Sequence, residues 1–254
     1  MKVKERASVV SQEKLAQGIY SLVLKTKAAE YAVPGQFISI FSNSGEKLLP
    51  RPISICEIDK LNSTLRMVYR VAGAGTKEFS ALAAGDSVEI MGPLGNGFPL
   101  EGSRPMVVGG GIGVPPMLEL AKQLNGSVTA VMGYRNDDMF LTEEFTDVAA
   151  EFCIATDDGS VGTHGTVVDA IKENQLECDV MYACGPKPML RALSGYAAEH
   201  GIKFYVSMEE RMACGIGACL ACVCQSTNVD EHSKVNNKRV CKEGPVFNAK
   251  EVEL

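Results

Sequence analysis

The sequence has no excess of basic residues and no long hydrophobic run. Lysine and arginine number 25 against 31 aspartate and glutamate residues, a net charge of −6, which opposes a nucleic-acid-binding role. The longest uncharged stretch, residues 212–229, has 18 residues with two glycines and four cysteines and ends in polar residues, whereas a membrane-spanning helix needs about 20 mostly apolar residues. The opening MKVKERASVV lacks the apolar core of a signal peptide. We therefore expect a cytoplasmic protein without a membrane span.

Histidine is also scarce, and the cysteines do not suggest disulfides. The three histidines stand far apart in the sequence and suggest no acid–base pair. Nine cysteines is an odd number in a chain without a secretion signal, which argues against a disulfide framework. Four of them are scattered, and the other five crowd the last 41 residues of the chain: Cys214, Cys219, Cys222, Cys224 and Cys241.

The length of 254 residues suits two domains and a small third unit. With 46% apolar and 22% charged residues, the composition is that of a globular protein. We expect a β plus α/β protein with units at residues 1–102, 103–208 and 209–254.

The first unit has the pattern of short strands separated by turns. Six β-branched or alternating segments predict strands at residues 7–12, 19–26, 35–41, 51–58, 64–71 and 86–92, with one helical patch at 77–84. Such a series of short strands predicts an antiparallel β-barrel.

The pattern changes at Pro105. Buried strands are predicted to begin at residues 106, 128, 151, 179 and 203, and helices are predicted at 115–124, 142–149, 165–174 and 187–200. Strands that alternate with helices indicate a doubly wound parallel sheet. From residue 214 onward the periodic patterns end, so something other than an apolar core must hold the third unit together.

The cysteines near the end have a metal-ligand spacing. Cys214-x4-Cys219-x2-Cys222 with a distant Cys241 is the plant-type pattern of a [2Fe–2S] cluster. A zinc site is the alternative, although the second C-x2–4-C knuckle that zinc sites usually have is missing. Cys224 is a surplus thiol that we interpret as a structural bystander, although its register also makes it a substitute for Cys222.

A glycine loop stands between a predicted strand and a predicted helix. Gly109, Gly110, Gly111 and Gly113 leave backbone amides free, and the helix N-terminus that follows favours an anion, so this context predicts a phosphate site of a dinucleotide. Pro115 replaces the last glycine of G-x-G-x-x-G, and proline is tolerated in the first turn of a helix. A turn without a ligand is the alternative.

A second signature, Cys184-Gly185-Pro186, follows another apolar strand. Ligands of such sheets bind beyond the carboxyl ends of the strands, so Cys184 and Gly185 are predicted to face the nucleotide. The alternative is that Cys184 is a buried thiol at the end of a strand.

Three segments of the barrel could bind an anion. Arg51 can form a bidentate pair with a phosphate, and Ser54 adds a hydroxyl group. Tyr69 and Arg70 offer an aromatic face and a further cation, and residues 73–76 precede the short helix with another helix N-terminus. Solvated charges are the alternative for each arginine.

Two charged segments each have two interpretations. Asn136, Asp137 and Asp138 follow a strand where acidic groups accept hydrogen bonds from ribose hydroxyls, which favours NAD, while Arg135 would instead suit the 2′-phosphate of NADP. Residues 209–211 are either a solvated charge run or a seat for the flavin or a partner.

In this order, the motifs RPIS, GAGT, GGGIGVPPM and CGPKPM resemble those of the ferredoxin–NADP reductase superfamily. The terminal CGIGACLACVC and VCKEGPVF resemble a narrower family, the electron-transfer subunits of class B dihydroorotate dehydrogenase. The resemblance covers essentially the whole chain. It implies FAD, a [2Fe–2S] cluster on Cys214, Cys219, Cys222 and Cys241, and a nicotinamide site on the second unit. The FAD site is implied at Arg51, Pro52, Ile53, Ser54, Val68, Tyr69, Arg70, Gly75 and Thr76.

The chain leaves no room for substrate chemistry of its own. A (β/α)8 barrel takes about 250 residues, and this chain uses that length for three electron-carrying units. The resemblance implies an FMN-containing catalytic subunit, a heterotetramer of two copies of each subunit, and electron flow from dihydroorotate through FMN, the cluster and FAD to NAD⁺. A related subunit that serves ferredoxin and NAD(P)H, a hydrogenase or a sulfide-handling partner is the alternative enzyme, and a zinc-knuckle binding module is the alternative of another class.

Overall fold

The first part of the chain is a closed barrel. The computed structural model describes residues 1–44, 48–229 and 234–254, so the third histidine, His232, lies outside the described residues. The six strands pair only antiparallel, in the order β1-β2-β5-β4-β3-β6. Their bounds are β1 Val3–Ala16, β2 Ile19–Lys25, β3 Phe37–Ile40, β4 Arg51–Asp59, β5 Thr64–Arg70 and β6 Ser87–Leu94. The predicted barrel is confirmed.

Alternation of apolar and polar residues explains the barrel strands. Leu22 and Leu24 of β2, and Leu65 and Met67 of β5, are fully buried in one apolar cluster inside the barrel. Strand β1 is much longer than predicted because it pairs with β2 at one end and with β6 at the other. The helical patch predicted at 77–84 is also displaced: helix α2 spans Ala74–Phe79, and α1 is a single turn at Ala28–Tyr31.

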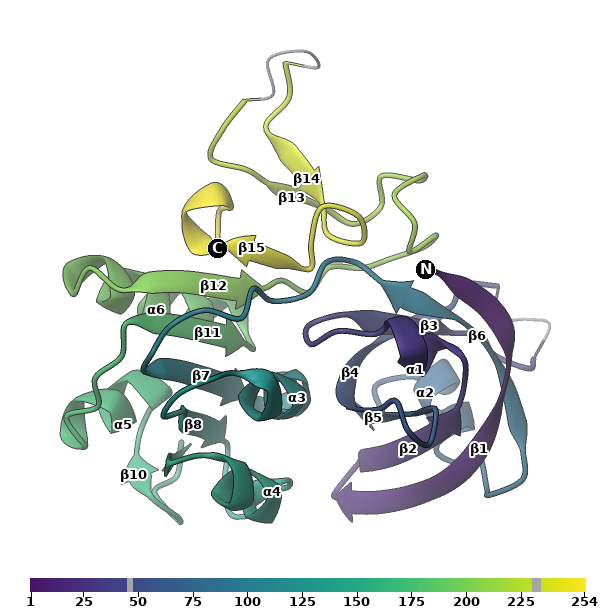
Figure 1. Ribbon diagram of the computed structural model, residues 1–254, viewed down its shortest axis with the longest axis horizontal. Helices are drawn as coiled ribbons and strands as arrows, with labels where there is room; N and C mark the ends of the chain where they lie inside the picture. Colours follow the sequence, from purple (N-terminus) through teal and green to yellow (C-terminus); the bar gives the residue numbers. More distant parts are fainter. Residues whose placement is uncertain (45–47, 230–233) are drawn as a thin grey trace.

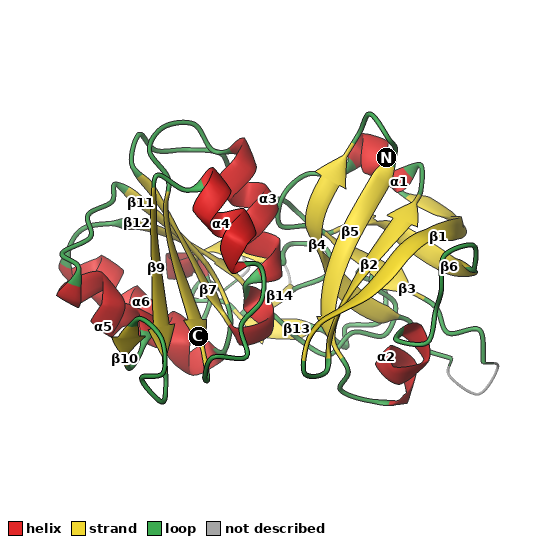
Figure 2. Ribbon diagram, turned by 90° about the horizontal axis from the view of Figure 1, so that it is seen from below, coloured by secondary structure: helices red, strands yellow, loops and turns green. Residues whose placement is uncertain are grey.

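The second part is a sheet with helices on both faces. Six parallel strands follow the order β10-β9-β8-β7-β11-β12. Helices α3 and α4 cover the face toward the barrel, and α5 and α6 cover the other (Figure 2). The strands are β7 Pro105–Gly110, β8 Thr129–Tyr134, β9 Glu151–Thr156, β10 Thr163–His164, β11 Val180–Cys184 and β12 Lys203–Ser207. The helices are α3 Pro115–Gln123, α4 Thr142–Val148, α5 Val167–Glu173 and α6 Lys187–Glu199, and the 3-10 turn η1 is Gly111–Gly113.

The tail changes one expectation about this sheet. Strand β15, Val246–Asn248, adds to the free edge of β12 and runs antiparallel to it, so the sheet is mixed and not purely parallel. An edge strand has unpaired backbone groups that a neighbouring segment can satisfy. The tail also forms the hairpin of β13, Val223–Gln225, and β14, Asn237–Arg239, and the short turn η2, Ala249–Glu251.

The tail lies above the junction of barrel and sheet (Figure 1). Its backbone is tied to the end of β6, because the Asn96 N–H donates to the Gly244 carbonyl at 2.6 Å. The cysteine-bearing segment therefore touches both larger parts of the molecule. Within the described residues, no helix is long and apolar enough to cross a membrane.

Candidate functional site

The predicted C-x4-C-x2-C segment wraps around its own first sulfur. Cys214 Sγ accepts hydrogen bonds from the backbone N–H groups of Ile216 at 3.5 Å and Ala218 at 3.3 Å. Gly217 has a φ of +87°, which favours glycine, and this allows the tight turn. Burial opposes ionisation of the Cys214 thiol, but these hydrogen bonds and the contact with Cys219 lower its pKa to about 6. The loop is therefore built to stabilise a thiolate, the form that binds metals.

The four predicted ligands form two pairs. The thiols of Cys214 and Cys219 contact each other, and so do those of Cys222 and Cys241. Two backbone contacts join the second pair: the Cys241 N–H donates to Cys222 Sγ at 3.4 Å, and the Val240 N–H donates to the Cys222 carbonyl at 3.0 Å. Burial, and then the Cys222 thiol, raises the pKa of Cys241 to about 12. The distant fourth cysteine thus returns to the loop of the other three.

The pairing suits a two-iron cluster better than a zinc ion. Zinc needs four donors around one point, whereas each iron of a [2Fe–2S] cluster takes two protein ligands. Within residues 1–44, 48–229 and 234–254, no three Cys, His, Asp or Glu side chains gather closely enough to hold a single metal ion. The two thiol pairs, Cys214 with Cys219 and Cys222 with Cys241, match the two irons of such a cluster, so the four cysteines remain our predicted ligands.

Cys224 lies apart from these pairs. It is buried, pairs with Lys238 across the β13–β14 hairpin, and lines a cavity of about 310 Å³ together with Lys187 and Glu210. The Glu210 carboxylate accepts a hydrogen bond from Lys187 Nζ at 2.6 Å, so this member of the predicted charge run is held by an ion pair. The surroundings of Cys224 favour its interpretation as a bystander.

The glycine loop and the Cys184 segment meet at the switch point of the sheet. Strands β7 and β11 are neighbours, and their connections leave in opposite directions, which is where doubly wound sheets bind ligands. The two segments approach so closely that a Cβ on Gly113 would lie 2.2 Å from the Cys184 carbonyl oxygen, and one on Gly110 would lie 3.2 Å from Pro186 Cδ. The structure thus brings Gly109–Gly113 and Cys184–Pro186 together, as the sequence predicted for a nucleotide site.

Cys184 itself is held in the neutral form. Its thiol contacts Ser207 at the end of β12, and burial raises its pKa to about 12. Helix α3 begins with Pro115 and Pro116, directly after the glycine turn. Because proline has no N–H to satisfy, the helix starts here without cost, and its N-terminus points toward the same switch point.

Two of the predicted flavin residues, Arg51 and Gly75, meet at the barrel, and a third, Arg70, faces the sheet. The Arg51 guanidinium lies against Gly75 so closely that a Cβ there would be 2.5 Å from Arg51 Nε. Arg70, at the end of β5, has an Nη atom 3.5 Å from the position of a Cβ on Gly111, so a barrel cation faces the glycine loop of the sheet. Thr76 Oγ1 accepts hydrogen bonds from the backbone at residues 72 and 73 and fixes the start of α2.

The aromatic face that we expected from Tyr69 is wrong. The Tyr69 ring is 1% exposed and packs inside the barrel against Tyr20 and Phe79. Its hydroxyl accepts a hydrogen bond from Gln12 Nε2 at 2.8 Å. Because side chains alternate along a strand, Tyr69 points inward while Val68 and Arg70 point outward. Only the backbone of Tyr69 can therefore contribute to the predicted flavin site.

The segment Pro52–Ser54 stays available for such a site. These residues of β4 pair with β3, with Ser54 opposite Phe37 and Pro52 opposite Ser39, and all are half-buried. Backbone and short side chains at a half-buried strand can contact a ligand without large rearrangement.

Arg51 gives a direct test of the flavin site. We expect Arg51→Ala to weaken flavin retention roughly 10- to 150-fold, because a lost charge-assisted hydrogen bond costs about 1.5–3 kcal/mol. The measurement is the amount of flavin that stays bound to each protein after dialysis, determined by its absorbance. Arg6→Ala is the control, since the Arg6 guanidinium donates to the Ser87 hydroxyl on β6 and its loss removes an exposed positive charge of the same barrel. Equal flavin loss in both variants would refute the site.

The residues proposed for ribose recognition are only partly free. The Asp138 carboxylate accepts a hydrogen bond from the Gln17 N–H at 3.0 Å, which ties the loop after β8 to the β1–β2 turn of the barrel. Asn136 Oδ1 accepts from the Asp138 N–H at 3.2 Å. Asp138 therefore braces the two large parts, which leaves Asp137 and Arg135 as the groups of this segment that could meet a ribose.

Sequence reasoning missed the loop after β9, which lies beside this segment. Backbone hydrogen bonds join the two: the Asp157 N–H donates to the Tyr134 carbonyl at 3.1 Å, and the Asp158 N–H donates to that of Arg135 at 3.3 Å. Hydrogen bonds from Ser160 lower the pKa of Asp158. The run Asp-Asp-Gly-Ser, at the carboxyl end of a parallel strand, was the signal that could have identified this loop.

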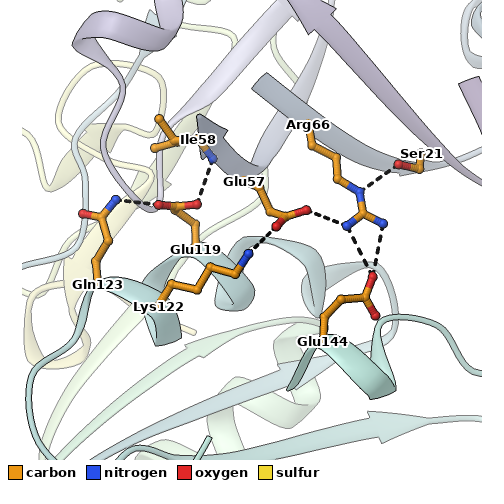
Figure 3. Close-up of polar contacts among 8 residues, drawn as sticks. All are labelled: Ser21, Glu57, Ile58, Arg66, Glu119, Lys122, Gln123 and Glu144. Atoms are coloured by element: carbon orange, nitrogen blue, oxygen red, sulfur yellow. Dashed lines mark hydrogen bonds and ion pairs between the residues drawn. The ribbon is translucent and has the colours of Figure 1, made fainter. Parts of the chain in front are cut away.

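Sequence reasoning also missed a polar network between the barrel and the sheet (Figure 3). Arg66 of β5 donates to Glu57 of β4 at 2.5 Å, to Glu144 of α4 at 3.3 Å and to Ser21 of β2 at 2.9 Å. Lys122 of α3 binds the second oxygen of Glu57. These charges lie far apart in the sequence, so no local pattern could reveal that they meet.

Glu119 is the most buried charged residue of this contact. The side chain is 5% exposed, and one of its carboxylate oxygens accepts from the backbone N–H of Ile58 at 2.8 Å while the other accepts from Gln123 at 2.6 Å (Figure 3). Burial raises the pKa of Glu119. Ile58 belongs to the strand that carries Arg51, and α3 begins at the glycine loop. Glu119 therefore links the predicted flavin strand to the predicted nucleotide loop.

We expect Glu119→Ala to destabilise the protein by about 1–3 kcal/mol, because the Ile58 N–H would lose its partner where water has little access. For a chain of this size that corresponds to a melting temperature lower by roughly 2–12 °C. Differential scanning calorimetry measures this melting temperature. Glu177→Ala, in an ion pair whose carboxylate side chain is 76% exposed, should leave the melting temperature unchanged. A shift of equal size in both variants would contradict the role of Glu119.

Comparison with known proteins adds a family model and full-length relatives. A model described as the iron–sulfur cluster binding domain of dihydroorotate dehydrogenase B matches residues 209–253. A protein of Bacillus caldolyticus named dihydroorotate dehydrogenase B (NAD(+)), electron transfer subunit, is 46% identical over 260 residues, and the match covers 99% of each chain. A protein of the same name from Listeria innocua is 44% identical over 254 residues, with 97% of each chain covered.

Solved structures share this fold over most of the chain. One described as an NADH-dependent reduced ferredoxin-NADP oxidoreductase, studied for flavin-based electron bifurcation, matches with a TM-score of 0.87 and 28% identity over 97% of this chain and 89% of its own. The flavohemoglobin of Malassezia yamatoensis, with bound FAD and heme, matches with a TM-score of 0.67 and 18% identity over 80% of this chain and 60% of its own. The second match concerns the fold alone.

Proposed function

Because the chain belongs to the family of electron-transfer subunits of dihydroorotate dehydrogenase B (NAD(+)), we propose that its three parts hold FAD, NAD and a [2Fe–2S] cluster at the residues described above. It is an oxidoreductase subunit that relays electrons for pyrimidine biosynthesis. When bound, the nicotinamide and flavin exchange hydride, and the cluster carries single electrons.

One observation carries this proposal: the three candidate sites meet at the barrel. Arg70 of the barrel lies against Gly111 of the nucleotide loop. On another side, a Cβ on Gly215 of the cysteine loop would lie 3.0 Å from Ser39 Oγ, and Ser39 pairs with Pro52 of the predicted flavin strand. A flavin held at residues 51–54 would therefore have the nicotinamide site and the cysteine pairs as its two neighbours.

The chain's own residues would do the following work. Arg51 and Arg70 supply positive charge for a diphosphate, and Ser54 supplies a hydroxyl group. Gly109, Gly110, Gly111 and Gly113 allow a dinucleotide to approach the backbone at the switch point, and Cys184 and Gly185 line the opposite wall. Cys214 and Cys219 would hold one iron, and Cys222 and Cys241 the other. This division follows the predicted units 1–102, 103–208 and 209–254.

The subunit works with a catalytic partner. We propose that this partner contains FMN and that two copies of each subunit form a heterotetramer. The exposed side chains around the cysteine loop support a docking face there, since Ile216 is 47% exposed and Leu220 is 60% exposed, and Cys219 between them is exposed too. Nine unpaired cysteines also fit the reducing cytoplasm that we propose as its location.

The experiment that tests the function compares the isolated chain with the complex. The purified chain should oxidise NADH with an artificial electron acceptor and should not oxidise dihydroorotate, because the substrate site belongs to the partner. Addition of the catalytic subunit should produce NADH from dihydroorotate and NAD⁺. Dihydroorotate oxidation by the isolated chain, or no NADH formation by the reconstituted complex, would overturn the proposal.

A further inference from the structure

The side chain of Arg239, in β14, links the two segments that carry the cysteine ligands. Its Nη1 donates to the Gly217 carbonyl at 3.0 Å, and Gly217 lies in the loop between Cys214 and Cys219. Arg239 itself stands two residues before Cys241 on the returning segment. The guanidinium therefore bridges the loop of three cysteines and the segment of the fourth.

Glu243 holds this guanidinium in place. The Arg239 Nε donates to both Glu243 oxygens at 3.1 and 3.0 Å, and Arg239 Nη2 donates to Oε1. The Arg239 backbone N–H also donates to Glu243 Oε2 at 2.7 Å. All three nitrogens of the guanidinium are therefore hydrogen-bonded: Nη1 to the cysteine loop, and Nε and Nη2 to the Glu243 carboxylate.

The same group is tied to the barrel. Asn96, just after β6, donates from Nδ2 to the Glu243 carbonyl at 2.8 Å and from its backbone N–H to the Gly244 carbonyl at 2.6 Å. The connection runs from the barrel through residues 243–244 and Arg239 to Gly217. It therefore fixes the cysteine loop relative to the barrel, the part of the molecule proposed to hold the flavin.

We propose that Arg239 and Glu243 form an ion-pair clasp that closes the cluster site and sets the reduction potential of the cluster. Arg239 is a positioning residue, because it acts through the loop and not as a ligand. This inference rests on the cluster of the proposed function. Hydrogen bonds and charges next to the cysteines are the means by which a protein adjusts such a centre.

Because Arg239 and Glu243 carry opposite charges, we expect their removal to shift the reduction potential of the cluster in opposite directions. Reduction adds one negative charge to the cluster. A nearby guanidinium stabilises the reduced form, and a nearby carboxylate destabilises it. The side chains of Arg239 and Glu243 are 29% and 33% exposed, so water screens them only in part. Removal of Arg239 leaves an unpaired carboxylate and should lower the potential, while removal of the Glu243 charge leaves an unpaired cation and should raise it.

The test is a redox titration of the purified full chain, followed by the electron paramagnetic resonance signal of the reduced cluster. Arg239→Gln should shift the reduction equilibrium up to about tenfold toward the oxidised form and Glu243→Gln by a similar factor toward the reduced form, where tenfold corresponds to about 59 mV for one electron. The double variant should return near the wild-type potential. Lys238→Gln is the matched control, since it removes a neighbouring positive charge that pairs with Glu251 instead.

A second measurement separates position from charge. Arg239→Lys keeps the charge but loses the fork, so its potential should stay near the wild-type value while a chelator removes iron at least threefold faster. Shifts of the same sign in both single variants, or a shift in Lys238→Gln as large as in Arg239→Gln, would overturn the clasp. Should Arg239→Gln fail to fold, Glu243→Gln and Arg239→Lys still decide the matter. Wild-type protein without iron and sulfide would instead refute the cluster itself.

Discussion

Replacement of Cys222 by alanine should leave the purified protein without its iron–sulfur cluster. The wild-type chain should contain about two irons and two acid-labile sulfides, and Cys222→Ala should contain almost none, because one iron would keep only a single thiolate. The Cys222 sulfur already accepts the Cys241 N–H, so no other cysteine occupies the same place. Iron and sulfide analysis, together with visible absorbance, measures the effect.

Cys224→Ala is the matched control, since it removes a buried thiol two residues away. Cys224 lies beside Lys187 and Glu210, so this variant should keep its iron and sulfide. The reverse result, with loss in Cys224→Ala and retention in Cys222→Ala, would exchange the two residues in the ligand set. Stoichiometric zinc without sulfide in the wild-type protein would replace the cluster by a zinc site.

The second large effect is expected at Gly113. In Gly113→Ala, the new Cβ would lie 2.2 Å from the Cys184 carbonyl oxygen and 2.6 Å from the Gly185 nitrogen. These are backbone atoms that cannot rotate away, so the two walls of the switch point must move apart. We expect an at least tenfold rise in the KM for NADH, together with a loss of about 1–3 kcal/mol in stability.

A glycine in a helix that packs on the same sheet provides the control. Gly195 of α6 has nothing within 4 Å of the position of its Cβ, so Gly195→Ala should stabilise the protein by about 0.5–1 kcal/mol and leave the KM unchanged. Flavin absorbance should be unchanged in both variants. A normal KM for NADH in Gly113→Ala would contradict the nucleotide site at this switch point.

Local patterns carried much of the prediction. Alternation along β2 and β5 predicts the barrel, because one face of each strand is buried. The glycine loop before Pro115 and the C-x4-C-x2-C spacing each depend on a few consecutive residues, and their backbone requirements appear in the sequence itself. These parts of the fold are confirmed, and the ligand residues stay predictions.

Burial of individual side chains was harder to predict. Tyr69 has an aromatic ring that could stack on a ligand, but the register of β5 turns this ring into the barrel. A shift of one residue would have turned it outward, because the period of a strand is two. The residues around Tyr69 do not show which face of the strand is buried in the barrel.

The amino-acid sequence alone determined the barrel, the sheet that follows it and the glycine turn, because short-range spacing and periodicity specify them, and the same kind of spacing predicts the four cysteine ligands. Only the tertiary structure decided that β15 completes the sheet, that Glu119 joins α3 to β4, and that Arg239 bridges the cysteine segments. Each of these contacts joins segments that are far apart in the sequence. Such segments meet only in the folded chain, where buried backbone and charged groups need hydrogen-bond partners.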